Sequence, residues 1–451
     1  MKFGGAALGN GEQIRDAARL IRDAAAKEPV VVVASAMSGV TNALMELAEL
    51  AARQDAAQIH GRLKEVRWRH LEASGKKDPP EPLRELLAEF EHVIHGVRIL
   101  GELTPRSRDR IADYGERLAA ALLSSALEAR AVRHRILAAD QTGLVTDDQF
   151  GAARPLEEPS LEAIARTLRP LLSEEIIPIL PGLSAATIGG TITSFGRGGS
   201  DIAAVLVAAA LGADDVWLWG NTDGLMTADP QIVPEARLIK EITAIEAIEM
   251  AQFGARAVHP RALEPLIAHK LSLRVRNAFR PDAEGTRIVH DGEKRAAVRA
   301  VHMIRDAGIL TLSGSVMFGR PGTAALLFDA LARERINVLM IAQSVSEAGI
   351  SVALRRRDLA RARAAAEREL VAPGAARSLH VDEQVALVAL VGAGMRDTHG
   401  VAGRLFGTVA AQHASIKAIA QGSSELSISF AVREDQAEAI VRALHAEFEP
   451  A

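Results

Sequence analysis

The chain has 451 residues, of which 48% are hydrophobic and 24% charged, and its formal net charge is −4. These values predict a soluble globular protein of two or three domains and exclude the strongly basic surface typical of nucleic-acid binding. Cysteine is absent, which excludes disulfides and thiolate metal sites, and no apolar run reaches the roughly 18 residues of a membrane span. No signal-peptide pattern follows Met1, so we expect a cytoplasmic protein that binds neither nucleic acid nor membrane.

The first 290 residues alternate short apolar runs with helical patterns. Residues 11–26 are predicted to be helical, because apolar side chains recur there at i, i+3, i+4 and i+7. Continuous apolar runs at 30–34, 176–180 and 216–219 predict strands buried on both faces, and residues 202–211 predict a helix. This alternation predicts an α/β domain with a mostly parallel sheet. Residues 52–110 are charged and helical in pattern, which indicates a helical excursion from that domain.

An internal repeat occupies the last 150 residues. Residues 336–354 read INVLMIAQSVSEAGISVAL, and residues 414–432 read ASIKAIAQGSSELSISFAV, so that Gln343 aligns with Gln421. Each copy predicts a strand, a helix, two strands joined by a turn, and a helix. Repetition of a whole βαββα unit predicts two similar domains in tandem.

Two glycine-rich turns are candidate anion sites. In Lys2-Phe3-Gly4-Gly5, glycines allow backbone amides to approach phosphate oxygens and Lys2 supplies a positive charge, although a tight strand-to-helix turn would use the same glycines. In the GRGGSD turn at 196–201, the planar guanidinium of Arg197 suits a carboxylate or phosphate. Ser200 or Asp201 could simply cap the helix that follows, but an arginine in a glycine-rich turn favours a functional role.

Other polar turns are ambiguous by themselves. Residues 35–42, SAMSGVTN, follow a predicted strand where ligands bind in open α/β sheets, but Thr41 could equally cap a helix. Residues 219–230, WGNTDGLMTADP, predict only a loop. Glu116 is placed at a helix start, where a glutamate is usually exposed, and residues 253–260, FGARAVHP, predict a helix end.

Taken together and in this order, the motifs resemble the aspartokinases, which belong to the amino acid kinase family and carry tandem ACT domains. The matches are KFGG, SAMSGVTN, the GER at 115–117, GRGGSD, the DG and TADP at 223–230, FGARAVHP and two QxxSE segments. Residues 90–103 and 394–396 look most similar to the kinase and regulatory part of bifunctional aspartokinase–homoserine dehydrogenases, although no dinucleotide-binding domain follows here. The resemblance implies a three-layer amino-acid-kinase sandwich at 1–290, with the helical excursion at about 52–110, and two ferredoxin-like ACT domains at 300–375 and 380–451.

The function implied by the resemblance is transfer of the γ-phosphoryl of ATP to the side-chain carboxylate of L-aspartate. A carboxylate is already nucleophilic at neutral pH, so positioning and cations are expected to carry catalysis, with Mg²⁺ held largely by the nucleotide phosphates and no protein metal cluster. The implied catalytic residues are Lys2, Asp201 and Arg256, the aspartate-binding residues are Ser35, Thr41, Glu116 and Arg197, and the ATP-binding residues are Lys2, Gly4, Gly5, Gly220, Asn221, Met226, Gln231 and Arg256.

Feedback regulation is also implied, by threonine or lysine bound to the first ACT copy. The expected effector residues are Phe318, Gly319, Gly322, Asn337 and Gln343, and a homodimer or homotetramer is expected. The alternative is a catalytically weak amino-acid-binding regulatory protein with a degenerate kinase scaffold. That alternative follows from departures from the family pattern, which usually has Thr-Asp at Gly220-Asn221, arginine at Gln231 and lysine at Arg256.

Overall fold

The structure is a computed structural model that describes residues 1–255, 257–292, 296–317, 321–345, 349–422 and 424–450. The chain divides into two compact units. Unit 1 comprises Met1–Leu225, Lys240–Ile248 and Arg256–Gly292, and unit 2 comprises Met226–Ile239, Glu249–Ala255 and Glu293–Ala451. Residues 226–239 and 249–255, which the sequence assigns to the kinase domain, therefore fold as part of unit 2.

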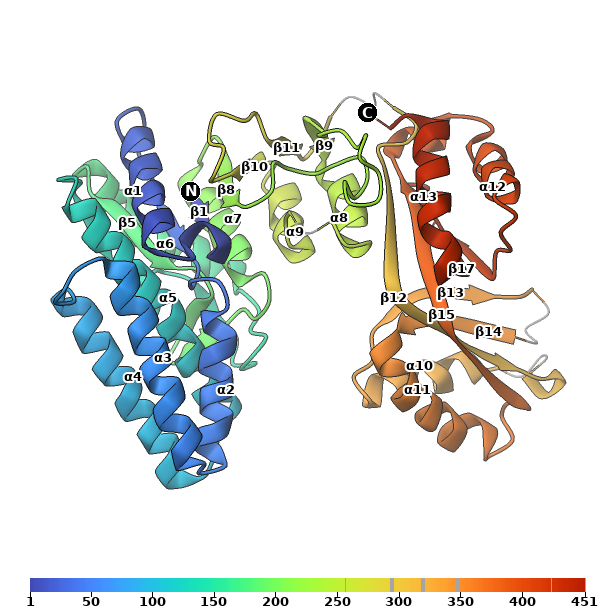
Figure 1. Cartoon of the computed structure of the whole chain (residues 1–451), viewed down its shortest axis with the longest axis horizontal. Helices are drawn as coiled ribbons and strands as arrows, with labels where there is room; N and C mark the ends of the chain where they lie inside the picture. The colour runs from blue at the N-terminus through green and yellow to red at the C-terminus, as the bar shows by residue number, and fades with distance from the viewer. Residues whose placement is uncertain (256, 293–295, 318–320, 346–348, 423, 451) are drawn as a thin grey trace. The chain divides into compact units, whose positions relative to one another are not determined.

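An eight-stranded sheet forms the centre of unit 1 (Figure 1). Strand β1 (Lys2–Phe3) lies between β2 (Val32–Ala34) and β8 (Val216–Gly220) and is parallel to both. The strand order is β3-β5-β2-β1-β8-β10-β11-β9, and only the β10–β11 pair is antiparallel among the described strands of this sheet. The other strands are β3 (His134–Ile136), β5 (Ile177–Pro181), β9 (Glu241–Thr243), β10 (Leu273–Asn277) and β11 (Thr286–Val289).

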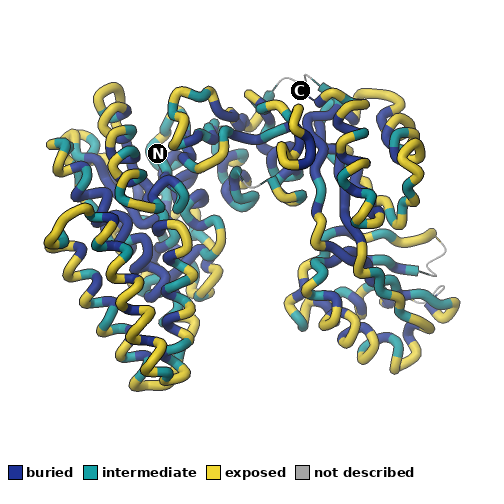
Figure 2. Tube along the Cα trace, in the orientation of Figure 1, coloured by how far each residue is buried: buried dark blue, intermediate teal, exposed yellow. Residues whose placement is uncertain are grey.

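Helices cover both faces of this sheet, which confirms the predicted three-layer sandwich. Alternate residues of β2 point to different cores: Val32 and Ala34 pack in the core shared with α1 (Gly11–Ala25) and α5 (Pro105–Glu128), whereas Val33 lies with residues of α7 (Gly199–Leu211). Figure 2 shows that buried residues gather in the interior of this unit and exposed residues lie on its outer helices. The other long helices are α2 (Val40–Ala52), α3 (Ala56–Ser74), α4 (Glu81–Leu100), α6 (Glu157–Ser173), α8 (Ala244–Gln252) and α9 (Pro260–Ala268), and a small sheet holds β4 (Val145–Thr146), β6 (Ser184–Thr187) and β7 (Ile192–Ser194).

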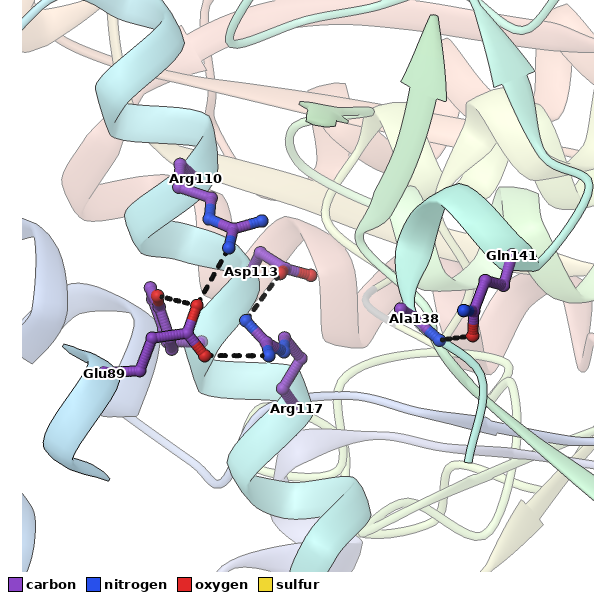
Figure 3. Close-up of polar contacts among 7 residues, drawn as sticks. Glu89, Arg110, Asp113, Arg117, Ala138 and Gln141 are labelled. Atoms are coloured by element: carbon purple, nitrogen blue, oxygen red, sulfur yellow. Dashed lines mark hydrogen bonds and ion pairs between the residues drawn. The ribbon is translucent and has the colours of Figure 1, made fainter. Parts of the chain in front are cut away.

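The helical excursion consists of α3 and α4, and a polar cluster ties it to α5 (Figure 3). One oxygen of Glu89 accepts hydrogen bonds from the Tyr114 hydroxyl at 2.7 Å and from Arg110 at 2.9 Å, and the other accepts from Arg117 at 3.1 Å. Because one carboxylate satisfies three donors of α5, the packing of α4 on α5 has a defined register.

Unit 2 contains the two predicted βαββα copies, which are confirmed and joined in one six-stranded antiparallel sheet. Its order is β13-β14-β12-β15-β17-β16, so the first strands of the two copies pair at the centre. The elements of copy one are β12 (Ala300–Ser313), α10 (Thr323–Arg333), β13 (Val338–Gln343), β14 (Gly349–Arg355) and α11 (Leu359–Ala366), and those of copy two are β15 (Ser378–Val391), α12 (Val401–Ala411), β16 (Ala418–Gln421), β17 (Ser427–Arg433) and α13 (Glu434–Phe448).

No helix in the described ranges combines the length and apolar character that a membrane span requires.

Replacement by alanine should have opposite effects on stability at two glycines of unit 1. A Cβ on Gly182, directly after β5, would lie 2.5 Å from Ser200 Cβ and 2.6 Å from Val33 Cγ1, whereas a Cβ on Gly96 inside α4 would meet nothing within 4 Å. Gly182→Ala should therefore destabilise by about 1–3 kcal/mol through overpacking. Gly96→Ala should stabilise by about 0.5–1 kcal/mol, because alanine loses less entropy in a helix. Urea unfolding of both variants measures the change in the free energy of unfolding, and a change of the same sign in both variants would contradict this packing.

Candidate functional site

Polar loops gather at the carboxyl edge of the central strands of unit 1. In the parallel register Phe3 pairs with Ala34 and Trp219, and Ala34 pairs with Pro181. The next residue of each strand therefore lies at the same edge of the sheet. Those residues are Gly4, Ser35, Gly182 and Gly220, and the edge is where ligands bind in open α/β sheets.

An ion pair joins the first strand to the start of α7. Lys2 Nζ lies 2.6 Å from Asp201 Oδ1, and the two side chains are only 14% and 12% exposed. The other oxygen of Asp201 accepts from the backbone amide of His259 at 3.2 Å. Two charges this far from water are tolerated because they are paired and hydrogen-bonded. The pair holds the only strong cation of β1 at the loop edge described above.

Hydroxyl groups meet at the same place. Ser35 Oγ donates to Ser200 Oγ at 2.8 Å, which connects the loop after β2 to the first turn of α7. Helix α7 is capped by Gly198, with φ of 81°, so neither Ser200 nor Asp201 is its N-cap. Likewise Gly39 and not Thr41 caps α2, and Thr41 is half-buried in its first turn. The capping explanations for these polar residues are therefore wrong, and their side chains have other uses.

Glu116 is buried deep in α5 and not at a helix start, so the predicted position in its helix is wrong. The reason is that α5 is buried on most of its surface and its pattern therefore has no clear polar face. The Glu116 carboxylate accepts a hydrogen bond from the Leu183 amide, just beyond β5. Burial raises the pKa of Glu116 to about 8, and the neighbouring charge of Asp113 adds to this, against the lowering effect of the Leu183 and Ala36 amides and of Lys2.

The glycines after β1 are required by close backbone contacts. A Cβ on Gly5 would lie 2.8 Å from the Ala36 carbonyl oxygen, so the loops after β1 and β2 touch. The Gly4 amide donates to the Trp219 carbonyl at 2.9 Å. The tight-turn explanation thus accounts for both glycines, and the Gly4 amide is already occupied before any phosphate arrives.

Arg197 lies between two left-handed glycines, Gly196 with φ of 69° and Gly198 with φ of 81°. Its side chain is exposed, and within the described ranges its guanidinium forms no ion pair. The charge of Arg197 contributes to a lowered pKa of His259, after the larger effect of burial. The exposed Arg197 and the buried Asp201 thus both act on His259, which places a cation near the start of α7.

The residues predicted for ATP are divided between the units. Gly220 ends β8 and Asn221 is exposed just after it, both in unit 1, whereas Met226 and Gln231 belong to unit 2. Arg256 lies outside the described residues.

The predicted effector residues do not form one cluster within the first ACT copy. Gly322 caps the start of α10, and exposed Gln343 ends β13 at the same edge of the copy, where Ser313 and Gly349 also pair. Asn337 follows the other end of α10, whose 11 residues span about 16 Å. One amino acid therefore cannot contact both Gly322 and Asn337 of the same copy. Phe318 and Gly319 lie outside the described residues.

Metal binding was tested on the side chains that the structure describes. They contain no group of three or more His, Asp or Glu residues placed to hold a metal ion. Asp201 is paired with Lys2. Mg²⁺ bound to nucleotide phosphates would need no such group of protein ligands, since it usually keeps several waters.

Sequence reasoning missed three residues that shape the site. Ser200 lies in the GRGGSD motif and His259 in the FGARAVHP motif, and neither was expected to be a site residue, although both contact predicted site residues. Asp109, in the first turns of α5, accepts from the amides of Gly151 and Ser194 at 2.9 Å each and so holds the chain before the GRGGSD turn. A lone aspartate in a charged helix gives no sequence signal for that contact.

Comparison with known proteins identifies the relatives of this chain. The model of the amino acid kinase family matches residues 1–277, and an ACT domain model matches 310–370 and 388–448. The bifunctional aspartokinase/homoserine dehydrogenase of Haemophilus influenzae is 30% identical over 99% of this chain, which spans 56% of that relative. Structures of E. coli aspartokinase III match with 29% identity over 99% of this chain: the complex with aspartate and ADP has a TM-score of 0.83 and covers 99% of that chain, and the complex with lysine and aspartate has a TM-score of 0.82 and covers 98%.

The buried Glu116 predicts an unusual dependence of stability on pH. Its folded pKa of about 8 exceeds the unfolded value of 4.5, so the free energy of unfolding falls as pH rises from about 4.5 to about 8, by at most about 1.4 kcal/mol per unit, and then levels off. Glu116→Gln removes this term. We expect the melting temperature of the variant relative to wild type to increase from pH 5 to pH 8.5.

Glu89→Gln is the matched control with the opposite sign. Burial raises the pKa of Glu89, but the hydrogen bonds from Tyr114 and Arg117 and the charges of Arg117 and Arg110 outweigh burial and lower it. Glu89 therefore stabilises at neutral pH, and that stabilisation is lost as pH falls through its folded pKa. If the two variants showed the same trend with pH, the environment described for Glu116 would be wrong.

Proposed function

The chain belongs to the amino acid kinase family, and from this premise we propose that it is an aspartate kinase regulated by an amino acid. It would transfer the γ-phosphoryl of ATP to the side-chain carboxylate of L-aspartate and form 4-phospho-L-aspartate. The observation that carries the proposal is the convergence of the Lys2–Asp201 pair, Glu116 and Arg197 around the loops after β1, β2 and β5. The similarity to an aspartokinase solved with aspartate and ADP supports the same substrates.

In the proposed mechanism an oxygen of the substrate carboxylate attacks the γ-phosphorus without a general base, the bond from the γ-phosphorus to the β,γ-bridging oxygen breaks, and ADP leaves. Arg197 binds a carboxylate of aspartate, and Glu116 faces the ammonium, with Ser35 and Thr41 beside them. A glutamic acid with a pKa of about 8 must ionise to pair with an ammonium. Aspartate binding at neutral pH is therefore coupled to release of a proton from Glu116.

Lys2 acts on the phosphoryl group, together with Arg256, and Asp201 keeps the Lys2 ammonium at the loop edge. Gly4, Gly5 and Gly220 would let the backbone approach the nucleotide closely, and the side chains of Asn221, Met226 and Gln231 would contact it. Mg²⁺ bound to the phosphates would neutralise further charge in the transition state. Homodimeric or homotetrameric assembly and a cytoplasmic location stay predictions of the sequence.

The direct test is formation of the acyl phosphate. Purified full-length protein is incubated with Mg²⁺, ATP and aspartate, and the product is trapped with hydroxylamine as the hydroxamate. Turnover that depends on both substrates supports the proposal. Nucleotide and effector binding without hydroxamate would favour the degenerate regulatory protein instead.

Arg197→Ala should raise the KM for aspartate and leave the KM for ATP nearly unchanged. Removing one partner of a desolvated charge pair costs about 2–5 kcal/mol, which corresponds to roughly 30-fold or more in KM. Arg197→Lys keeps the positive charge but lacks the planar guanidinium, so its KM for aspartate should lie between those of wild type and Arg197→Ala. Steady-state kinetics in both substrates measures the difference, and an unchanged aspartate KM would remove Arg197 from the site.

The effector is proposed to bind at the end of the first copy that holds Gly322 and Gln343, with threonine as first choice and lysine as second. Gln343→Ala should weaken feedback inhibition, whereas Gln421→Ala at the equivalent position of the second copy should not. Inhibition curves with each amino acid measure this.

Asn337→Ala separates two forms of the effector site, because Asn337 lies at the far end of α10. A site built by one copy alone predicts unchanged inhibition, and loss of inhibition would mean that another copy supplies Asn337. Ser415→Ala, the aligned position in the second copy, is the control. No inhibition of wild type by either amino acid would defeat the regulatory proposal.

A further inference from the structure

The segment Met226–Ile239 carries two residues proposed to bind nucleotide, but it folds with unit 2. Its apolar side chains Ala228, Ile232 and Val233 are buried in the same core as Val441 and Leu444 of α13. The three consecutive residues between Ala228 and Ile232, which are Asp229, Pro230 and Gln231, are exposed. The segment is thus anchored in unit 2 by one set of side chains and presents the other set outward.

A buried hydrogen-bond network fixes the start of this segment. Thr227, fully buried, accepts from the Arg237 amide through its hydroxyl oxygen at 2.9 Å, and its own amide donates to the Arg237 carbonyl at 2.9 Å. The Thr227 carbonyl accepts from the amide of Val301 in β12 at 2.8 Å. The remaining polar contact of the hydroxyl is with His445 Nε2 of α13, at 2.9 Å.

The chemistry of this contact defines the role of the histidine. The Thr227 oxygen accepts from the Arg237 amide, and a neutral His445 that carries its proton on Nδ1 leaves Nε2 free to accept the proton of the Thr227 hydroxyl. Burial lowers the pKa of His445, and the charge of Arg237 acts in the same direction, so the neutral ring is favoured. Arg237 in turn donates to the carbonyls of Glu449 and Pro450 just after α13, at 3.0 and 2.7 Å.

A second histidine holds the neighbouring residue. His302, buried in β12 of the first ACT copy, hydrogen-bonds to the backbone of Met226. Adjacent residues of one segment are therefore held by histidines from the two ACT copies, His302 from the first and His445 from the second.

We infer that His445 is a positioning residue for nucleotide binding, acting from the last helix of the second ACT copy through the hydroxyl of Thr227. This inference rests on the proposed function. Without the His445 contact the proton of a buried hydroxyl loses its acceptor, and the turn that presents Met226 and Gln231 is no longer held at its start. His445 itself need not touch ATP, aspartate or the reacting atoms.

The test compares matched variants of the full-length chain. His445→Leu and Thr227→Val each replace one of the two hydrogen-bonding side chains with an apolar side chain of similar volume. His445→Gln and Thr227→Ser each keep a group that can still form the hydrogen bond. Val409→Ala in α12 trims the same core away from the segment and is the control for general loss of stability. Binding of Mg²⁺-ADP is measured by calorimetry, KM values for ATP and aspartate by kinetics, and protection of residues 226–239 by hydrogen exchange.

We expect His445→Leu and Thr227→Val each to weaken Mg²⁺-ADP binding about fivefold, as for loss of one buried hydrogen bond. The KM for ATP should rise alongside, and the KM for aspartate should stay within about twofold of wild type. The double variant should lose no more than either single variant, because both remove one contact. His445→Gln and Thr227→Ser should recover most of the affinity.

Two outcomes overturn the inference. Unchanged Mg²⁺-ADP affinity in a folded His445→Leu protein with reduced protection at 226–239 would show that the network does not position the site. An equal loss in Val409→Ala would assign the effect to general destabilisation. If His445→Leu does not fold, unchanged Mg²⁺-ADP affinity in Thr227→Val, compared with Thr227→Ser, would overturn the inference in the same way. Wild type that fails to bind Mg²⁺-ADP would instead defeat the proposed function itself.

Discussion

The parallel pairing of β1 with both β2 and β8 is the constraint on which the rest of unit 1 depends. A strand of two residues places Lys2 inside the sheet and within one residue of its carboxyl edge. An ammonium at that depth is stabilised by a counter-charge, because burial of an unpaired charge is costly. Asp201 in the first turn of α7 supplies it, and Gly198, with φ of 81°, starts that helix.

Glu116 represents the opposite solution to the same problem. Among the described residues no cation forms an ion pair with it, and the protein keeps its carboxyl group buried with a raised pKa. Burial of this group costs free energy of folding, which a cation placed beside the ionised carboxylate would offset. The loop edge therefore holds one ion pair that is already neutral, Lys2 with Asp201, and one carboxyl group, Glu116, that can pair with an added positive charge. This combination suits a zwitterionic amino acid.

Much of the fold was predictable because local patterns determine it. The apolar runs of β2, β5 and β8 and the repeat in unit 2 gave the sandwich and the paired ACT copies. The contacts that define the site were not predictable, since Ser35 and Ser200 are 165 residues apart and Asp109 and Ser194 are 85 apart. The depth of Glu116 was also hidden, because a helix buried on most sides loses the polar stripe that marks orientation. The effector residues were grouped by motif, but α10 separates Gly322 from Asn337.

The membership of residues 226–239 in unit 2 gives regulation a physical route. The segment leaves unit 1 after β8 and returns at β9, yet its core contacts and buried hydrogen bonds belong to the ACT copies. An effector can change nucleotide affinity only if it interacts differently with two arrangements of some shared element, and coupling of this kind is reciprocal. A segment that is covalently part of one unit and packed as part of the other is such an element. If nucleotide binds this segment as proposed, it must change effector affinity by the same factor that the effector changes nucleotide affinity.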